Sequence, residues 1–590
     1  MADDSNNVTG DYIPPSCDFN RVIMNLTVTS RGRQFDRLAL MYFGDTEVWR
    51  TSTAEPTAGG IEWTYVKDVT HYLYLWKQPQ KLIFDLGNLV DDTYTGLFNT
   101  TLTATFLTSD EPFDAADLII PVSARRSESG SASVFNLPHE KAINTLTLPR
   151  NANRAVFTIA ACGQAEEEFW WSNVLQSSVD TFKNTTGALP GFSAWREIQV
   201  YIDGHLAGLQ WPFPVIFTGG VAPGLWRPIV GIEAFDLQEY EVDITSWLGL
   251  LSDGEPHTFE IKVVGLLDDG KGSYNDRLFA TNNVPSTPNT TVMETVGRSW
   301  LVTGKIFLWL DEPGSITTGE PPRTSFTAHF VVGQLIETDD GGKNVSLRNQ
   351  IRAEGRIAHE ALITTASGQQ RVRSAQWSDY RSKTHLTRYG VAQDTRNSLR
   401  RGASGRAEGF TDDVVGDADL DYRMDVRSEY FLDPEEAGKL RIEAWVNTAC
   451  GWKVGGGVFP SGLEGVGQGG GEGRVETVQR GEATYEAEMG RRGRGTTRQE
   501  YALRDVGRGE EVEVYHRDVT ARDGWVVRDE EREMGRETVR TDGAGGVRPE
   551  GVLQDGVQRS VRELLGRGPG KVAQVLVQSG GVVEDADAEG

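Results

Sequence analysis

The chain has 590 residues, a formal net charge of −26 and a hydrophobic content of 38%. This length exceeds what one hydrophobic core supports, so we expect roughly three or four domains. The low hydrophobic content indicates that part of the chain does not fold. The acidic charge argues against a nucleic-acid partner, because phosphate binding requires a basic face. No stretch reaches the roughly 18 apolar residues of a membrane span.

The cysteines and histidines give no sign of a bound metal. Three cysteines, Cys17, Cys162 and Cys450, form at most one disulfide. No Cys-x-x-Cys motif and no Cys/His cluster indicates zinc or haem. We therefore expect no metal and no other cofactor.

The compartment signals conflict. The sequence contains six Asn-x-Ser/Thr sequons, which favour glycosylation in the secretory pathway, at Asn7, Asn25, Asn99, Asn184, Asn289 and Asn344. The N-terminus, MADDSNNVTG, has neither the basic nor the apolar region of a signal peptide. We expect a secreted protein or one in the endomembrane lumen, with an N-terminus that is truncated or wrongly started.

From residue 21 to about residue 311 the pattern is typical of short antiparallel strands. The segments are rich in β-branched and aromatic residues and are bounded by Gly, Pro, Asn and Asp. They cover residues 81–85, 101–108, 154–161, 197–202, 258–264 and 305–310. In residues 197–202, Ile198, Val200 and Ile202 alternate with polar neighbours, and Asp203-Gly204 then predicts a hairpin turn. The fold class expected is all-β, with consecutive antiparallel β-sandwich domains of the jelly-roll kind.

Composition shifts divide the chain into four parts. We predict a first β-sandwich over residues 11–150, a second over residues 151–320 and a further β-rich region over residues 325–452. The segment 453–590 contains 29 of the chain's 67 glycines, with 18 arginines and two lysines. Because no apolar face persists there, we expect a disordered Gly/Arg-rich tail that activity does not need. A misread reading frame is one hypothesis for its composition.

The first sandwich contains two candidate catalytic carboxylates. Asp36 lies between Phe35 and Arg37 before an apolar strand, where apolar neighbours and an arginine shift a carboxyl pKa. The alternative is an Asp–Arg pair that orders the strand edge. Glu55 precedes Pro56 in a polar loop, which is typical of a substrate loop or of an ordinary surface loop.

The second sandwich supplies acidic and aromatic residues suited to sugar binding. Glu166, Glu167 and Glu168 run into Phe169-Trp170-Trp171, and a ring can stack on a sugar while a carboxylate accepts its hydroxyls. Trp211 and Trp226 repeat the pattern, although a single tryptophan is more often part of a core. The sequence has no Gly-x-Ser-x-Gly or His-Glu-x-x-His motif, so a carboxylate mechanism remains if the protein is an enzyme.

Nine ordered blocks carry a resemblance to the peptide-N-glycosidase A family. They are GRQFDR (32–37), RTSTAEPT (50–57), WTYVKDVT (63–70), LGNLVDDTYTG (86–96), DLIIPVS (117–123), FWWSN (169–173), REIQVYIDG (196–204), WPFPVIFTGG (211–220) and LWRPIVGIEAFDL (225–237). The chain also looks distantly similar to secreted bacterial peptide-N-glycosidases, which are built from two jelly rolls.

The resemblance implies hydrolysis of the amide between the innermost N-acetylglucosamine and asparagine, without a metal. The substrates would be N-glycosylated peptides or denatured glycoproteins, and the products a glycosylamine and aspartate. It assigns the key carboxylate to Asp36 and leaves the assisting glutamate open between Glu168 and Glu197, with Glu197 otherwise expected to bind substrate. In the mechanism this implies, Glu168 or Glu55 binds the first sugar or protonates the leaving nitrogen. Arg37 and the tryptophans Trp63, Trp171, Trp211 and Trp226 are then expected to bind substrate in a groove between the sandwiches.

Other readings remain open at this point. One is an N-glycan-binding β-sandwich protein without catalysis, and another is a structural glycoprotein. A glycosidase with paired carboxylates is a third. The released product separates them, because only an amidase converts the asparagine to aspartate.

Overall fold

The computed structural model describes residues 7–57, 59–110, 113–274, 290–292, 296–408, 414–432, 439–455, 471–486, 492–505, 512–523, 525–533, 536–540 and 573–577. Within this part the chain is nearly all β, as predicted, and its sheets are antiparallel. The helical elements are short: α1 (Leu73–Trp76), α2 (Leu248–Leu251) and the 3₁₀ turns η1 (Thr70–Tyr72), η2 (Ser127–Ser129), η3 (Ala165–Glu167), η4 (Trp170–Ser172), η5 (Gln176–Ser178), η6 (Pro223–Trp226), η7 (Thr245–Trp247) and η9 (Arg388–Gly390).

The N-terminal unit consists of two four-stranded sheets around an apolar core. Side chains alternate along its strands, so that Val22, Met24 and Leu26 point into the core while their neighbours are half-buried. The first sheet has the order β1 (Asn7–Tyr12), β6 (Gln80–Leu86), β3 (Leu38–Phe43) and β4 (Thr46–Ser52). The second has the order β31 (Ala573–Val577), β7 (Leu97–Leu107), β2 (Arg21–Arg31) and β5 (Ile61–Asp68).

The second unit also has two sheets, of four and five strands. The first has the order β10 (Ala142–Leu146), β15 (His257–Val264), β12 (Glu197–Ile202) and β13 (His205–Gln210). The second has the order β14 (Tyr240–Asp243), β11 (Ala152–Gly163), β18 (Trp300–Leu310) and β8 (Leu118–Val122), with β9 (Phe135–Leu137) also on β18. A further pair is β16 (Leu266–Asp268) and β17 (Thr290–Val292).

Two details of the second unit bear on the predictions from sequence. The turn at Asp203-Gly204 joins β12 to β13 with positive φ at both residues, as expected for a tight hairpin. Strands β8, β9 and β10 pair with β18 and β15 of this unit, although they lie within residues 11–150, the range predicted for the first sandwich. The polar residues between these strands therefore lie in loops of the second unit.

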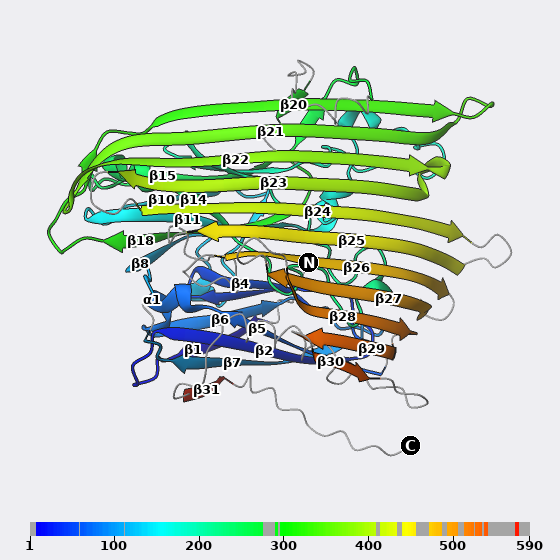
Figure 1. Cartoon of the computed structure of the whole chain (residues 1–590), viewed down its shortest axis with the longest axis horizontal. Helices are drawn as coiled ribbons and strands as arrows, with labels where there is room; N and C mark the ends of the chain where they lie inside the picture. Colours follow the sequence, from blue (N-terminus) through cyan, green and yellow to red (C-terminus); the bar gives the residue numbers. More distant parts are fainter. Residues whose placement is uncertain are drawn as a thin grey trace.

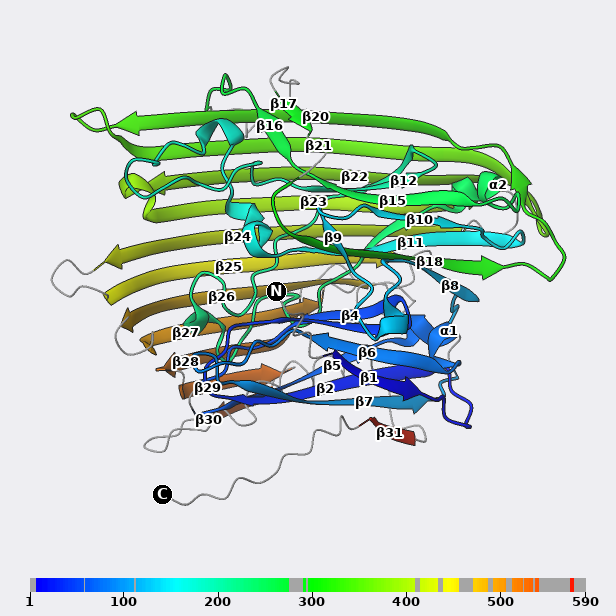
Figure 2. The ribbon, with the colours of Figure 1, turned by 180° about the vertical axis from the view of Figure 1, so that it is seen from behind.

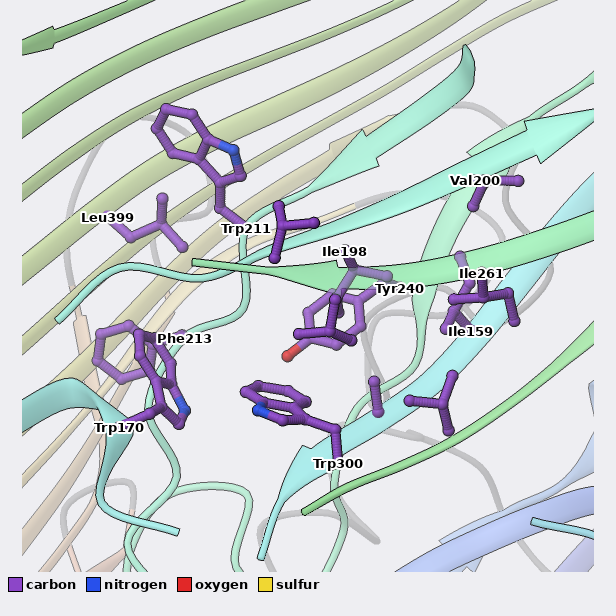
Figure 3. Packing of buried hydrophobic residues seen from close by; sticks show 14 of the residues in the cluster. Ile159, Trp170, Ile198, Val200, Trp211, Phe213, Tyr240, Ile261, Trp300 and Leu399 are labelled. Carbon is purple, nitrogen blue, oxygen red and sulfur yellow. The ribbon is translucent and has the colours of Figure 1, made fainter. Parts of the chain in front are cut away.

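A long twisted sheet lies alongside the two units, in front of them in Figure 1 and behind them in Figure 2. Its order is β19 (Thr318–Gly319), β21 (Asn344–Thr365), β22 (Gly368–Thr387), β23 (Ala392–Glu408), β24 (Val414–Leu432), β25 (Lys439–Gly455), β26 (Gly471–Glu486), β27 (Arg492–Asp505), β28 (Val512–Arg522), β29 (Trp525–Glu533) and β30 (Arg536–Arg540), with β20 (Arg323–Thr338) on β21. Residues such as Ile351, Leu399 and Val446 join the core of the second unit (Figure 3).

The long sheet corrects the expected start of the disordered tail, because β26 to β30 continue it beyond Trp452. No continuous apolar face stands out in these strands because many of their inward side chains are polar. Thr477, Gln479 and Gln499 are almost fully buried, and the Thr477 hydroxyl lies 2.7 Å from that of Thr448. Hydrogen bonds between strands thus replace apolar contacts. The expected disorder of residues 541–572 and 578–590 lies outside the described residues.

Candidate active site

Asp36 lies in the loop that joins β2 to β3, and the backbone around it is tied to the end of β4. The Arg37 N–H donates to Thr53 Oγ1 at 2.8 Å, and the Thr53 N–H donates to the Arg37 carbonyl at 2.8 Å. The Arg37 guanidinium donates to Gln34 Oε1, while its Nε is buried without a hydrogen-bond partner in the described structure. These bonds fasten the segment that carries the half-buried Asp36.

Glu55 follows β4 and lies beside Asp36. Its residue is only 8% exposed. The Asp36 N–H donates to its carboxylate. From the loop after η6, Arg227 donates to the Glu55 carbonyl at 3.0 Å and lies 3.4 Å from Glu55 Oε2. The segment that we expected to be a substrate loop is therefore buried and forms one side of the site.

Gly219 brings the second unit against both carboxylates. Its N–H donates to the Asp36 carboxylate. A β carbon at this position would lie 2.8 Å from Glu55 Oε1 and closer still to Asp36 Oδ1. Only glycine leaves enough room for this approach. The neighbouring Gly220 carbonyl accepts from Trp226 Nε1 at 2.7 Å, which fixes the loop.

Glu168 is the third carboxyl group of the site and comes from the end of η3 in the second unit. It is close enough to Asp36 for the charge of Asp36 to raise its pKa. The preceding residue, Glu167, is buried and paired with Arg196 through bonds of 2.6 and 2.9 Å. Trp300 Nε1 donates to the same carboxylate at 2.9 Å. These contacts fix the turn from which Glu168 projects.

Burial dominates the electrostatics of the three carboxyl groups. It raises the pKa of Asp36 above its usual value, opposed by the hydrogen bond from Gly219. Burial raises the pKa of Glu55 to about 7, where Arg227 opposes the shift and Asp36 adds to it. Burial and the charge of Asp36 raise the pKa of Glu168 to about 7. The site can therefore hold protonated and ionised carboxyl groups together near neutral pH.

Two exposed phenylalanines flank these carboxyl groups in the sequence. Phe35 directly precedes Asp36 and is 41% exposed, while Phe169 directly follows Glu168 and is 38% exposed. The rings come from different units. They offer apolar faces next to polar acceptors, which is the combination that a sugar ring requires.

The structure corrects the expectation that tryptophans line this groove. Trp63, Trp171, Trp211 and Trp226 are each at most 2% exposed, so none has a free face for a sugar. Trp63 stacks on Phe235 in the N-terminal core, and Trp211 packs in the second core (Figure 3). Burial in the two cores removes these large apolar side chains from water, which is more favourable than an exposed position.

Glu197 also lies away from the carboxyl cluster. It is 2% exposed and accepts from Trp211 Nε1 at 2.7 Å and from Gln199 Nε2 at 2.6 Å. Its carboxylate satisfies buried donors in the core. Of the two candidates for a carboxyl group of the second unit, only Glu168 is beside Asp36.

Sequence reasoning missed Gly219 and Arg227 as members of the site. Both lie within blocks that carry the family resemblance, but neither has a local pattern that indicates a role. Each acts through a contact with a segment that is distant in the sequence.

The remaining predicted positions vary in their surroundings. Asn99 and Asn184 are exposed, whereas Asn25 is half-buried and the amides of Asn7 and Asn344 donate to backbone carbonyls. Asn289 lies outside the described residues.

All three cysteines are free thiols. Among the described residues, no group of side chains has a metal-binding arrangement, and no helix is long and apolar enough to cross a membrane.

A family model and a similar protein identify the same family. Residues 4–324 match the family model described as peptide N-acetyl-β-D-glucosaminyl asparaginase amidase A. A protein of Prunus dulcis named peptide-N4-(N-acetyl-β-glucosaminyl)asparagine amidase A is 34% identical over 334 residues. This alignment covers 53% of each chain, so the chain spans about half the length of that relative. A solved structure of PNGF-II aligns with 11% identity and a TM-score of 0.32 over 52% of this chain and 60% of the other.

Proposed function

This chain belongs to the peptide N-acetyl-β-D-glucosaminyl asparaginase amidase A family, and we propose that it hydrolyses the amide between the innermost N-acetylglucosamine and asparagine. The substrates are N-glycosylated peptides or denatured glycoproteins. The products are the glycan as a glycosylamine and a peptide with aspartate in place of asparagine. The observation that carries this proposal is the cluster of Asp36, Glu55 and Glu168 against Gly219.

We assign Asp36 as the base that activates water against the side-chain carbonyl carbon of the asparagine. It is the carboxyl group with a hydrogen bond from Gly219 and a neighbouring Arg37, and both favour its ionised form. The Arg37 guanidinium is our choice of donor for the negative charge that develops on the amide oxygen.

Glu168 is our choice for the acid that protonates the leaving nitrogen. Its pKa of about 7 means that it carries a proton under weakly acidic conditions, and a group with its pKa near the working pH transfers protons efficiently. Glu55 has a similar pKa but is held by Arg227, which suits binding and orientation of the first sugar. Phe35 and Phe169 then stack on the sugar or the adjoining peptide.

Two wider assignments belong to the same proposal. The paired sheets of the N-terminal and second units are two jelly rolls, with the site in the groove between them, where ligands commonly bind. The protein works in the secretory pathway or outside the cell, consistent with its exposed sequons at Asn99 and Asn184. Its acidic surface disfavours nucleic acid.

The full chain and its Asp36→Asn variant test the proposal together. Each is incubated with a defined N-glycopeptide, and the peptide product is sequenced by mass spectrometry. We expect free glycan and an Asp-containing peptide from the wild type, and a loss of roughly a thousandfold in kcat for the variant. Retained turnover in Asp36→Asn excludes its role as base. A peptide that keeps one sugar on asparagine identifies a glycosidase, and binding without cleavage identifies a glycan-binding protein.

A further inference from the structure

Four apolar side chains lie on two segments that are joined beside Asp36. They are Phe35, which precedes Asp36 in the chain, and Leu89, Val90 and Tyr94 of the loop that is bonded to Gln34, and we call them the apolar patch. Phe35, Leu89 and Val90 are 41%, 48% and 44% exposed, and the rings of Phe35 and Tyr94 are 4.9 Å apart. Exposed large apolar side chains that gather beside a polar site commonly mark a contact surface.

The loop that carries Leu89 and Val90 is firmly held. Gln34 Nε2 donates to the Leu89 carbonyl at 2.8 Å, so the loop is fastened to the segment that carries Asp36. Asn88 Nδ2 donates to the Gly96 carbonyl at 3.0 Å. Asp91 Oδ1 accepts hydrogen bonds from two backbone N–H groups that come later in the loop, each at 2.7 Å. The apolar side chains are thus displayed on a preorganised loop, which lowers the entropy lost on binding.

The chemistry of the patch selects its occupant. The side chains of Leu89 and Val90 cannot form hydrogen bonds, so they offer nothing to the hydroxyl groups of a glycan. They suit the apolar side chain of a polypeptide. If the glycosylated asparagine reacts at Asp36, the residues next to it in an extended peptide lie about 3.3 Å further along per residue. The patch adjoins Asp36 and is therefore within reach of these neighbours.

We propose that the apolar patch binds an apolar side chain of the substrate polypeptide within about two residues of the glycosylated asparagine. The inference rests on the proposed function and adds a specificity for the peptide part of the substrate. Folded glycoproteins bury most of their apolar side chains. The patch therefore selects unfolded or extended segments.

Two synthetic glycopeptides test this inference. They carry the same glycan and differ only in having leucine or serine two residues before the asparagine, outside the Asn-x-Ser/Thr sequon. We expect the wild type to show a kcat/KM roughly tenfold higher for the leucine peptide, mainly through KM. The variant L89S/V90S should lose this preference. Ile143→Ser is the matched control, because Ile143 is 42% exposed on β10 of the second unit. It should keep the preference.

The outcomes separate the inference from the proposed function. If the wild type cleaves neither peptide, the proposed function fails. If it cleaves both and L89S/V90S keeps the leucine preference, the patch does not bind the peptide. A wild-type dimer that L89S/V90S converts to a monomer with unchanged preference would instead assign the patch to self-association. Leu89→Ala repeats the test if the double variant does not fold, as judged by circular dichroism.

Discussion

The backbone N–H of Gly219 donates to the side-chain carboxylate of Asp36, so a loop of the second unit directly contacts the candidate base of the N-terminal unit. Because of this bond, residues from both units together form the site. The bond also stabilises the ionised form of Asp36 against the effect of burial. Neither unit alone would complete the arrangement.

We predict that Gly219→Ala strongly reduces turnover while the protein stays folded. The new β carbon would lie 2.8 Å from Glu55 Oε1 and closer to Asp36 Oδ1, so the loop and both carboxyl groups must shift. A shift of about 1 Å in a catalytic arrangement costs roughly a hundredfold in rate. Gly10→Ala is the control, because nothing lies within 4 Å of its β-carbon position. Equal kcat values for the two variants would contradict the tight contact at Gly219.

The pH dependence of activity follows from the two glutamates. Burial raises the pKa of Glu55 and Glu168 from 4.5 to about 7. If a protonated glutamate donates to the leaving nitrogen, kcat falls as the pH rises above about 7. Glu168→Gln should abolish most turnover across the pH range. Glu55→Gln should instead raise KM and leave the alkaline limb in place. The reverse pattern in pH–rate profiles would exchange the two roles.

The same pKa shifts also predict how stability depends on pH. Between pH 4.5 and about 7 the folded protein binds more protons at these two sites than the unfolded chain does. Their contribution to the free energy of unfolding therefore decreases as the pH rises through this window. Urea titrations of the wild type and of a variant with both glutamates changed to glutamine check this, because the variant should lose this part of the pH dependence.

The strands of the two units could be predicted from the sequence because they depend on local pattern. The Phe35-Asp36-Arg37 motif is also local, and it singled out Asp36 as a candidate whose catalytic role stays a prediction. Alternation in residues 197–202 and the turn at Asp203-Gly204 need no information from the rest of the chain. Arg227 and Gly219 could not be found in this way, because their roles exist only where two loops meet. The strands after Trp452 were not predicted for a related reason. Polar residues such as Gln499 suggest exposure to solvent unless their buried hydrogen-bond partners are known.

Arg196 and Glu167 provide a prediction about stability. Both side chains are at most 1% exposed and form a bidentate pair that also receives the Trp300 N–H. Arg196→Met leaves the Glu167 charge buried and unpaired, which we expect to lower the free energy of unfolding by roughly 3–5 kcal/mol. Adding Glu167→Gln removes that charge and should recover part of the loss. Chemical denaturation measures both, and identical losses would exclude the buried charge as the cause.

The strands beyond Trp452 were expected to be unnecessary for activity, yet β27 reaches the candidate site. Gln499 Nε2 donates to the carbonyls of Leu225 and Arg227, the latter at 2.9 Å, and Gln499 Oε1 accepts the Ile229 N–H at 2.7 Å. Arg227 in turn contacts Glu55. One buried side chain of the long sheet therefore fixes the loop that presents Arg227.

We predict that Gln499→Ala lowers kcat by roughly tenfold, because three buried backbone groups lose their partner and the loop shifts. Arg227 lowers the pKa of Glu55, so its displacement should raise that pKa further and move the titration of Glu55 to higher pH. Gln479→Ala is the matched control. Gln479 on β26 is equally buried and pairs in register with Gln499, and its Oε1 accepts a hydrogen bond from Thr477 Oγ1 at 3.3 Å. If both variants reduce stability alike and neither changes the pH–rate profile, Gln499 supports the sheet without positioning Arg227. A positioning role requires that only Gln499→Ala change the profile, and in that case removal of the chain after Trp452 must also impair activity.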